Sequence, residues 1–262
     1  MTVLYDLPEE AKIDFSKRDN GAVIGITSPR AGNGKSLLSL LLANQMTRLD
    51  YGLKVCVLDM DIFDGQLGLM TNNLSPTILN VLDDVETPLI DRLQNSLIFD
   101  EKLNIHVLLA PDLNHEVAYL DSALFKEIIT ALKETFDIII IDAPSPHISS
   151  LTANVMYPLS DIVLSVSSLN RGSSAGLQAW LQEVQEGNPE LLKKAGLVMN
   201  FDYPNLDTQN MRENLVLPIL GIIPSTHAEV AEALHLQDVS VLLRGDTEFA
   251  KSIESLACKL FV

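Results

Sequence analysis

The stretch Gly25-Ile-Thr-Ser-Pro-Arg-Ala-Gly-Asn-Gly-Lys-Ser36 lies between a run of apolar residues and a segment with helical spacing. A glycine-rich turn that leads into a helix directs several backbone N–H groups and the positive end of the helix toward one point, which suits a polyphosphate. We therefore predict a phosphate-binding loop in which Lys35 reaches the β- and γ-phosphates and Ser36 offers its hydroxyl to Mg²⁺. The residues expected to contact the nucleotide here are Ala31, Gly32, Asn33, Gly34, Lys35, Ser36 and Leu37.

The spacing of this loop departs from the standard G-x-x-x-x-G-K-[ST] pattern, because Pro29 stands where the first glycine is expected. The triplet Gly34-Lys35-Ser36 still matches. A Gly-Lys-Ser triplet alone is weak evidence for a phosphate site. Its position between a strand and a helix, together with two acidic motifs, carries the prediction.

The two acidic motifs end predicted strands. Asp59-Met-Asp61 ends one of these strands, and Asp142 ends another. A carboxylate at the carboxyl end of a strand beside a phosphate loop can hold Mg²⁺ or its waters, so Asp142 is the best candidate for that role and Asp59 is a second metal candidate. If the strand continues past Asp59, then Asp59 and Asp61 project to opposite faces and have different functions. Solvated carboxylates at strand ends are the alternative.

Apolar runs alternate with amphipathic stretches along the chain, which predicts an α/β fold with a doubly wound, mostly parallel sheet and helices on both faces. Ligands then bind at the carboxyl ends of the strands. The expected strands are 22–27, 54–58, 105–109, 137–141, 162–166, 196–199 and 219–223, and the expected helices are 36–49, 121–134, 151–157, 174–185, 228–234 and 247–260. We expect a short helix with loops over 74–102, and a single domain over 21–262 after an N-terminal extension of residues 1–20.

The composition disfavours several classes of function. The 262 residues carry 18 Lys and Arg against 35 Asp and Glu, a formal net charge of −17, which repels a nucleic-acid backbone. The apolar runs are too short to span a bilayer, and the N-terminus has no signal-like apolar segment, so we expect a cytoplasmic protein. Cys56 and Cys258 are expected on apolar faces as small buried side chains.

These motifs resemble those of the ParA/MinD-type deviant Walker ATPases, and within them the CpaE/TadZ branch associated with Flp (Tad) pilus assembly. The family pattern K-G-G-x-G-K-[ST] lies over Arg30-Ala-Gly-Asn-Gly-Lys-Ser36, and the branch's second motif lies over Leu58-Asp-Met-Asp-Ile-Phe-Asp-Gly-Gln-Leu-Gly68. Later matches are Val107–Pro111, Phe136–Asp142, Val198–Asn200, Ile223–Pro224 and Ala231–Leu234, so the likeness runs from about residue 21 to residue 257.

The resemblance implies a P-loop NTPase of the SIMIBI type, which binds ATP with Mg²⁺, forms a nucleotide-sandwich homodimer and hydrolyses ATP slowly. By motif match, Lys35 binds the phosphates, Asp61 orients the attacking water, and Asn200 contacts adenine. Pro224 is counted with the nucleotide-binding residues. The implied metal ligands and metal-shell residues are Ser36, Asp59 and Asp142. A turn residue is the alternative for Asn200.

Two residues depart from the family pattern. Arg30 replaces the signature lysine that reaches the partner subunit's nucleotide. Its guanidinium keeps the charge and suits phosphate, so a catalytic role in trans is expected, with a solvated loop residue as the alternative. Ala31 replaces the first glycine and adds a Cβ, which fits only if this residue has a negative φ. These departures leave the rate of hydrolysis open.

The sequence leaves several functions open. An ATP-driven dimeric switch that localises or organises a pilus or secretion machine comes first, with itself and assembly proteins as partners, at a cell pole or inner-membrane face. A non-hydrolysing scaffold and a bacterial tyrosine kinase-like domain are the alternatives. Such kinases end in a tyrosine cluster, whereas the last tyrosine here is Tyr203. Nucleic acid is disfavoured, and membrane contact by 247–260 is at most peripheral, since only Lys251 and Lys259 are basic there.

Overall fold

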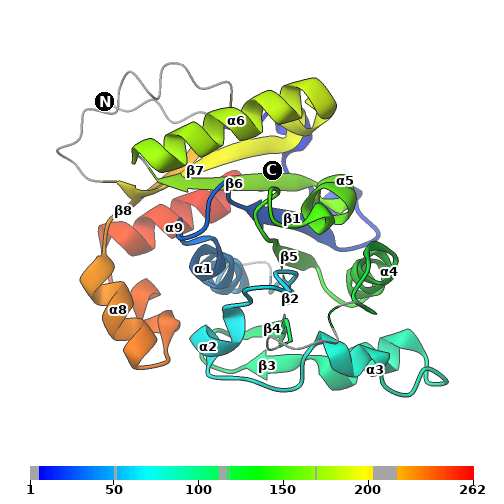
Figure 1. Cartoon of the computed structure of the whole chain (residues 1–262). Helices are drawn as coiled ribbons and strands as arrows, with labels where there is room; N and C mark the ends of the chain where they lie inside the picture. Colours follow the sequence, from blue (N-terminus) through cyan, green and yellow to red (C-terminus); the bar gives the residue numbers. More distant parts are fainter. Residues whose placement is uncertain (1–5, 50–51, 112–116, 118, 169, 203–216) are drawn as a thin grey trace.

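The computed structural model describes residues 6–49, 52–111, 117, 119–168, 170–202 and 217–262. Within them the chain forms one eight-stranded sheet with helices on both faces (Figure 1). The strands are β1 (Ala22–Thr27), β2 (Val55–Asp59), β3 (Ile98–Asp100), β4 (Ile105–Leu108), β5 (Ile138–Asp142), β6 (Ile162–Ser168), β7 (Ala195–Asp202) and β8 (Ile219–Pro224). The helices are α1 (Lys35–Thr47), α2 (Leu67–Thr71), α3 (Leu89–Ser96), α4 (Ser122–Lys133), α5 (Tyr157–Leu159), α6 (Arg171–Gly187), α8 (His227–His235) and α9 (Glu248–Lys259).

The sheet has the order β3-β4-β2-β5-β1-β6-β7-β8. All of its pairings are parallel except that of β3 with β4. From the central β1 the chain winds first toward β2 and β4 and later toward β6, β7 and β8. The loop after β1 therefore lies where the winding reverses, which is where open α/β sheets bind ligands. This confirms the predicted doubly wound fold.

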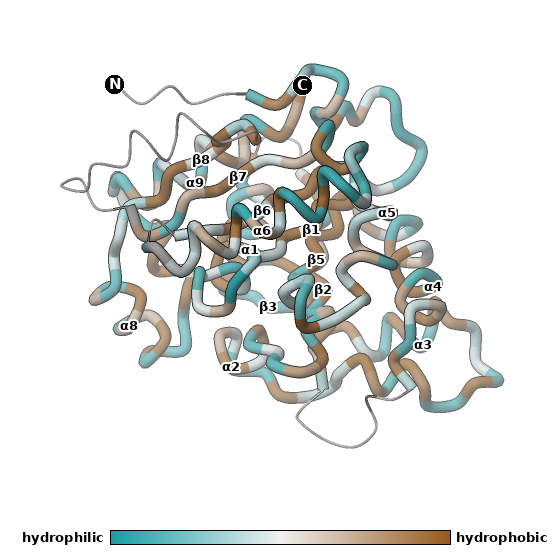
Figure 2. Tube along the Cα trace, turned by 45° about the horizontal axis from the view of Figure 1, so that its top comes forward, coloured by the Kyte–Doolittle hydropathy of each residue, from teal (hydrophilic) through white to brown (hydrophobic). Residues whose placement is uncertain are grey.

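Each face of the sheet has its own hydrophobic core. In β5, Ile138 and Ile140 pack into one core and Ile139 and Ile141 into the other, because alternate side chains of a strand point to opposite faces. The first core is covered by α1, α8 and α9, and the second by α3, α4 and α6. Figure 2 shows the hydrophobic residues concentrated along the central strands. Strands buried on both faces explain the uninterrupted apolar runs of the sequence.

Helix α1 is buried on nearly all sides, because it packs against the sheet and also against α9. Its apolar residues therefore do not form a single stripe, as expected for a helix inside the protein. Since α1 begins at Lys35, this burial fixes the end of the phosphate loop in the centre of the molecule.

The segment before β1 packs into the core that also holds α1. Leu7 and Ile13 are buried there, and Ile13 forms a β-bridge with Phe261.

The structure corrects three expectations. Over 74–102 it has a 3₁₀ turn (Ile78–Leu82) and α3, but also the edge strand β3. The three residues of β3 are too few to show a pattern in the sequence, and only Asp100 is buried. The helix expected over 151–157 begins as a π-turn (Thr152–Met156) and continues as α5. Cys56 is buried as expected, but Cys258 is exposed, because the buried side of α9 is formed by Ile253, Leu256 and Ala257.

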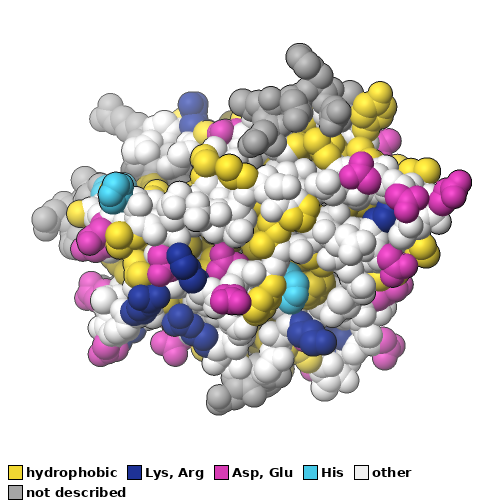
Figure 3. Space-filling view, turned by 90° about the horizontal axis from the view of Figure 1, so that it is seen from below, with side chains coloured by type: hydrophobic (Ala, Val, Ile, Leu, Met, Phe, Trp, Pro, Cys, Tyr) yellow, Lys and Arg dark blue, Asp and Glu magenta, His cyan; other side chains and the backbone are white. Residues whose placement is uncertain are grey.

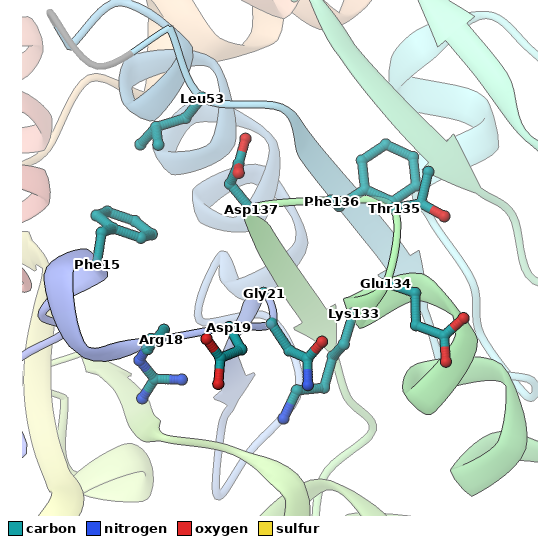
Figure 4. Close-up of a pocket in the computed structure, with 11 residues that line it drawn as sticks. Phe15, Arg18, Asp19, Gly21, Leu53, Lys133, Glu134, Thr135, Phe136 and Asp137 are labelled. Carbon is teal, nitrogen blue, oxygen red and sulfur yellow. The ribbon is translucent and has the colours of Figure 1, made fainter.

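At the opposite end of the sheet from the phosphate loop, the segment before β1 and the α4–β5 connection enclose a cavity of about 350 Å³ (Figure 4). Arg18, Asp19, Lys133 and Glu134 line it, so its wall mixes both signs of charge. Arg18 forms an ion pair with Asp161, with 2.8 Å between Nη2 and Oδ1.

No helix among the described residues is long and apolar enough to cross a membrane.

Candidate functional site

The loop between β1 and α1 has the backbone that its glycines allow. Gly32 has a φ of +80°, and Gly34, at the start of α1, has a φ of +82°. A Cβ on Gly34 would lie 2.4 Å from Nδ2 of Asn200, so glycine is required there on both grounds. Ala31 is not among the described residues with positive φ, which satisfies the condition that its extra Cβ imposes. The loop is therefore compatible with this sequence despite Pro29 and Ala31.

Lys35 lies at the centre of an acidic cluster. Its Nζ is 2.9 Å from Oδ2 of Asp61 and 3.7 Å from Oδ1 of Asp142. Burial acts to lower the pKa of Lys35, but the carboxylates of Asp142 and Asp61 outweigh it and raise the pKa above its ordinary value. The side chain is therefore a fixed cation, placed beside the backbone N–H groups at the start of α1.

Asp59 and Asp142 lie side by side, because β2 and β5 pair in the register that joins these two residues. Both are buried, at 1% and 0% exposure. Burial raises the pKa of Asp59 well above its ordinary value, the charge of Asp142 raises it further, and Lys35 opposes both. Burial likewise raises the pKa of Asp142, against the effect of Lys35 and a hydrogen bond from Ser36. Three carboxyl groups thus lie around one ammonium, and a bound cation would favour the charged forms of Asp59 and Asp142 against the effect of burial.

The residues present fit a magnesium ion. Oδ2 of Asp142 is buried without a hydrogen-bond partner among the described residues, and the hydroxyl of Ser36 lies close enough to bond this carboxyl. Mg²⁺ takes few protein oxygens and completes its shell with water and phosphate. In the part of the chain that the structure describes, no group of three or more His, Cys, Asp or Glu residues is placed so that it could hold a metal ion by itself. Ser36 and Asp142 would hold the ion, with Asp59 behind them.

Asp59 and Asp61 do differ in their contacts, although not because a strand separates them. β2 ends at Asp59, so Asp61 lies in the turn that follows. Oδ1 of Asp59 accepts a hydrogen bond from the backbone N–H of Asp61 at 3.1 Å, and its Oδ2 accepts one from Leu67 at 3.4 Å. Asp59 therefore holds the turn in place, while Asp61 faces Lys35.

Arg30 is exposed, and its side chain lies against α6. A Cβ added at Gly176 would be 2.9 Å from Cγ and 3.2 Å from Nε of Arg30. The absence of a side chain at Gly176 therefore makes room for the arginine. Arg30 is thus a residue of the loop whose side chain contacts α6 at Gly176, whereas the side chain of Lys35 contacts the acidic cluster.

The side chain of Asn33 joins the loop to α6, a role that the sequence reasoning missed. Its Nδ2 donates to Oγ of Ser28 at 2.9 Å, and its Oδ1 accepts from Oγ of Ser173 at 2.9 Å. Ser168, at the end of β6, donates to Ser173 in turn. The sequence does contain a signal for this contact. Asn33 is the variable residue of the loop motif, and serines occur at the end of the neighbouring strand β6 (Ser168) and near the start of α6 (Ser173).

Asn200, Pro224 and Leu37, which the resemblance assigns to the nucleotide site, line one narrow crevice beside Gly34 at the start of α1. Nδ2 of Asn200 donates to the backbone oxygen of Asn33 at 2.8 Å. The neighbouring Phe201 has a φ of +59°, and its ring lies 4.8 Å from that of His227. The space left between these groups is only about 10 Å³. A base would therefore have to displace the Phe201 ring or the Asn200 amide.

Comparisons with known proteins agree with this geometry. Residues 21–195 match the sequence family described as AAA domain. The septum site-determining protein MinD of Helicobacter pylori is 26% identical over 248 residues, which cover 91% of this chain and 90% of that protein.

Solved structures show the same fold. The ParA family ATPase from Chlorobium tepidum matches with a TM-score of 0.80 at 16% identity, over 90% of this chain and 98% of the other. MinD from Pyrococcus horikoshii, complexed with Mg-ADP, matches with a TM-score of 0.71 at 20% identity, over 90% and 94% of the two chains. These likenesses confirm the predicted class of fold.

Proposed function

The chain belongs to the AAA domain family and is similar to MinD and to a ParA family ATPase. From this likeness and the site, we propose that it binds ATP with Mg²⁺, dimerises on it and hydrolyses it slowly as a molecular switch. The observation that carries this proposal is the Lys35 cluster: a buried ammonium at the start of α1, surrounded by Asp59, Asp61 and Asp142. This arrangement has a fixed cation for the phosphates and spare carboxylate charge for a divalent ion.

Lys35 changes partners in this proposal. In the structure, Nζ of Lys35 is 2.9 Å from Oδ2 of Asp61. When a triphosphate lies over the loop, Lys35 binds the β- and γ-phosphates, and the Asp61 carboxylate becomes free to accept a hydrogen bond from the attacking water. Mg²⁺ held by Ser36 and Asp142 would neutralise charge on the same phosphates. The remaining buried carboxyl group, that of Asp59, keeps Asp61 in position because it accepts a hydrogen bond from the backbone N–H of Asp61.

Arg30 is proposed to act in the dimer. Its side chain is exposed and lies against Gly176 of α6. A guanidinium on the surface beside the loop can reach the nucleotide of a second copy, where it would stabilise the charge that develops on the phosphates. Arg30 therefore makes dimerisation and hydrolysis parts of one step.

The finer role rests on the likeness of Leu58–Gly68 to the second motif of the CpaE/TadZ branch. We propose that the switch localises or organises a Flp/Tad-type pilus or secretion machine, in the cytoplasm and at a pole or the inner-membrane face, through assembly proteins that recognise one nucleotide state. Copurification of pilus assembly proteins with the ATP-bound chain, but not with the nucleotide-free chain, supports this role, and their absence from both overturns it.

A non-hydrolysing scaffold that binds nucleotide only to fix its dimer is the second candidate, because Arg30 and Ala31 depart from the family pattern of the phosphate loop. Release of phosphate distinguishes the two functions. The switch predicts slow release that Asp61→Asn abolishes, whereas a scaffold predicts the same background for both proteins.

The dimerisation step is tested by light scattering of the full chain with and without ATP and Mg²⁺. The switch predicts a doubling of mass with nucleotide and none for Lys35→Ala, whose fold is checked by circular dichroism. An unchanged mass of the wild type at saturating ATP would contradict the proposed dimer.

A further inference from the structure

A chain of hydrogen bonds runs from the start of α6 into the phosphate loop, and each group in it donates to the next. Nδ2 of Asn170 donates to Oγ of Ser168, at the end of β6, at 2.6 Å. Oγ of Ser168 donates to Oγ of Ser173 at 2.9 Å. Oγ of Ser173 donates in turn to Oδ1 of Asn33 at 2.9 Å. The side chain of Asn33 is therefore the point at which this hydrogen-bond chain enters the loop.

Inside the loop, the same hydrogen-bond chain ends at the backbone of Arg30. Nδ2 of Asn33 donates to Oγ of Ser28 at 2.9 Å and to the backbone oxygen of Arg30 at 3.2 Å. Oγ of Ser28 donates to the same oxygen at 2.6 Å. Both amide hydrogens of Asn33 are thus used by the protein, so a contact of Asn33 with a phosphate would come from its backbone N–H. The carboxamide itself holds the backbone of the residue that carries the guanidinium.

The central members of this hydrogen-bond chain are buried. Each of their side chains is at most 7% exposed: Ser28, Asn33, Ser168 and Ser173. Hydrogen bonds that follow one another in the same direction polarise each other, and they are stronger in the protein interior than in water. Removal of one member leaves its neighbours buried without a partner, which costs free energy. The loop and the start of α6 are therefore held in one arrangement.

The loop contacts α6 at a second point, about one turn further along the helix. A Cβ added at Gly176 would be 2.9 Å from Cγ of Arg30, so the aliphatic part of Arg30 lies against this glycine. Ser173 and Gly176 are three residues apart and therefore lie on the same side of α6. This side of the helix holds the side chain of Arg30 directly and its backbone through Asn33.

We propose that Asn33 is a positioning residue for Arg30, because its carboxamide fixes the backbone of Arg30 and the start of α6 relative to one another. The family pattern K-G-G-x-G-K-[ST] leaves the position of Asn33 open, so this role belongs to this chain and not to the pattern. Since the role rests on the proposed function, in which Arg30 reaches the nucleotide of a second copy, we expect it to affect turnover. A guanidinium that is already held in place loses less freedom when it docks on the phosphates.

The position of Arg30 is tested first without nucleotide, by ¹⁵N relaxation of its Nε–H group in the full chain, with the signal assigned from its loss in Arg30→Lys. Ser173→Ala removes the donor to Asn33, and Asn33→Leu removes the carboxamide at similar size. We expect both changes to lower the heteronuclear NOE of the Arg30 Nε–H group, because the side chain gains fast motion. Ser173→Thr keeps the hydroxyl and should keep the wild-type value. An unchanged NOE in both Ser173→Ala and Asn33→Leu would overturn the proposal, whether or not the chain hydrolyses ATP.

The effect on the reaction is tested by turnover at saturating ATP and Mg²⁺. We expect Ser173→Ala to lower kcat about tenfold, while the affinity for ATP measured by calorimetry changes less than about twofold. Adding Ser173→Ala to Arg30→Ala should cause no further loss. Equal falls in affinity and kcat, or additive losses in the double variant, would overturn the positioning role. An absence of turnover in the wild type would contradict the proposed function, and the relaxation measurement then decides on the position of Arg30 alone.

Ser96→Ala is the matched control for Ser173→Ala. Ser96 is also a buried helical serine, and its Oγ donates to the backbone oxygen of Arg92 within α3 at 2.8 Å. This change should lower the melting temperature, but it should alter neither the NOE of the Arg30 Nε–H group nor kcat. If Ser96→Ala lowered both as Ser173→Ala does, loss of stability alone would explain the effects and the proposal would be overturned.

Discussion

Lys35 organises the site at the scale of single residues, because one buried ammonium is shared among several carboxylates. The sequence located Lys35, Ser36 and the acids at the strand ends, since a motif and the carboxyl ends of strands are both readable from residue order. It could not show which carboxylate pairs with the lysine. That depends on β2 ending at Asp59, so that Asp61 turns toward Lys35.

Asp142→Asn should stabilise the nucleotide-free protein while it weakens Mg²⁺-dependent ATP binding. Its buried Oδ2 has no donor among the described residues, so an amide loses little there and removes a buried charge. We expect the melting temperature at pH 7 to rise by about 2–4 °C, the shift that roughly 1 kcal/mol produces in a chain of this size. Differential scanning fluorimetry without nucleotide measures it, and a lower melting temperature would contradict the assigned burial cost.

The rise in melting temperature that Asp142→Asn produces should also depend on pH. Because the folded pKa of Asp142 is raised above its ordinary value of 3.8, the folded chain binds a proton more tightly than the unfolded chain. Wild-type stability therefore falls as the pH rises from 3.8 through the folded pKa, and the variant lacks this fall. We expect Asp142→Asn to have the higher melting temperature at pH 7, and we expect its difference from the wild type to shrink as the pH is lowered. A difference that grows as the pH falls would reverse the assigned sign.

Gly176→Ala should impair hydrolysis without changing ATP affinity. The added Cβ displaces the Arg30 side chain, whose Cγ would lie 2.9 Å away. We expect turnover to fall on the order of tenfold, with little further loss when Arg30→Ala is added. Gly187→Ala, at the end of the same helix with nothing within 4 Å, is the control. Additive losses in the double variant would show that Gly176 does not act through Arg30.

At the scale of elements, the central strands and the long helices were predictable because each is strongly apolar or periodic. β5 consists of four isoleucines and an aspartate, all buried, and no other assignment suits such a run. β3 was missed because three edge residues carry no period and pair antiparallel with β4. Cys258 was misplaced because a one-residue error in the phase of a helix moves a side chain from the core to the surface.

The contact between α5 and α6 depends on one buried hydrogen bond. Nε1 of Trp180 donates to the Tyr157 hydroxyl at 2.7 Å. Tyr157→Phe leaves the indole N–H without this acceptor and should lower the free energy of unfolding by about 1–3 kcal/mol. Urea titration should show a lower midpoint with an unchanged m-value. Tyr119→Phe is the control, because Tyr119 is 71% exposed, and it should change neither the midpoint nor the m-value. An unaltered midpoint for Tyr157→Phe would contradict the contribution of this hydrogen bond to stability.

At the scale of the whole molecule, the net charge of −17 disfavours nucleic acid as a partner. In Figure 3, acidic side chains lie among the basic ones on the face seen from below. Fluorescence anisotropy of a labelled DNA duplex in 50 mM salt should show no saturable binding at micromolar protein, with or without ATP, because few phosphates can be neutralised. Binding that weakens steeply with added salt would contradict this and favour a partition role.

The cavity between the end of β8, α8 and the start of α9 differs from the phosphate loop in the charged groups that line it. The loop collects a lysine and helix N–H groups, whereas the cavity between α8 and α9 collects glutamates. The sequence could not reveal this cavity, because its wall comes from three separate segments whose approach depends on tertiary packing. Nor could the sequence show that Phe201 and Asn200 narrow the crevice beside Gly34, since the positions of both residues depend on where β7 lies relative to α1.

The most direct test of the account is calorimetric titration of ATP into the folded, nucleotide-free chain, with and without Mg²⁺. We predict one site per chain, binding that Mg²⁺ strengthens, and loss of the heat in Lys35→Ala. An absence of heat with the wild type, or equal binding by wild type and Lys35→Ala, would contradict the claim that the loop ending at Lys35 holds a triphosphate.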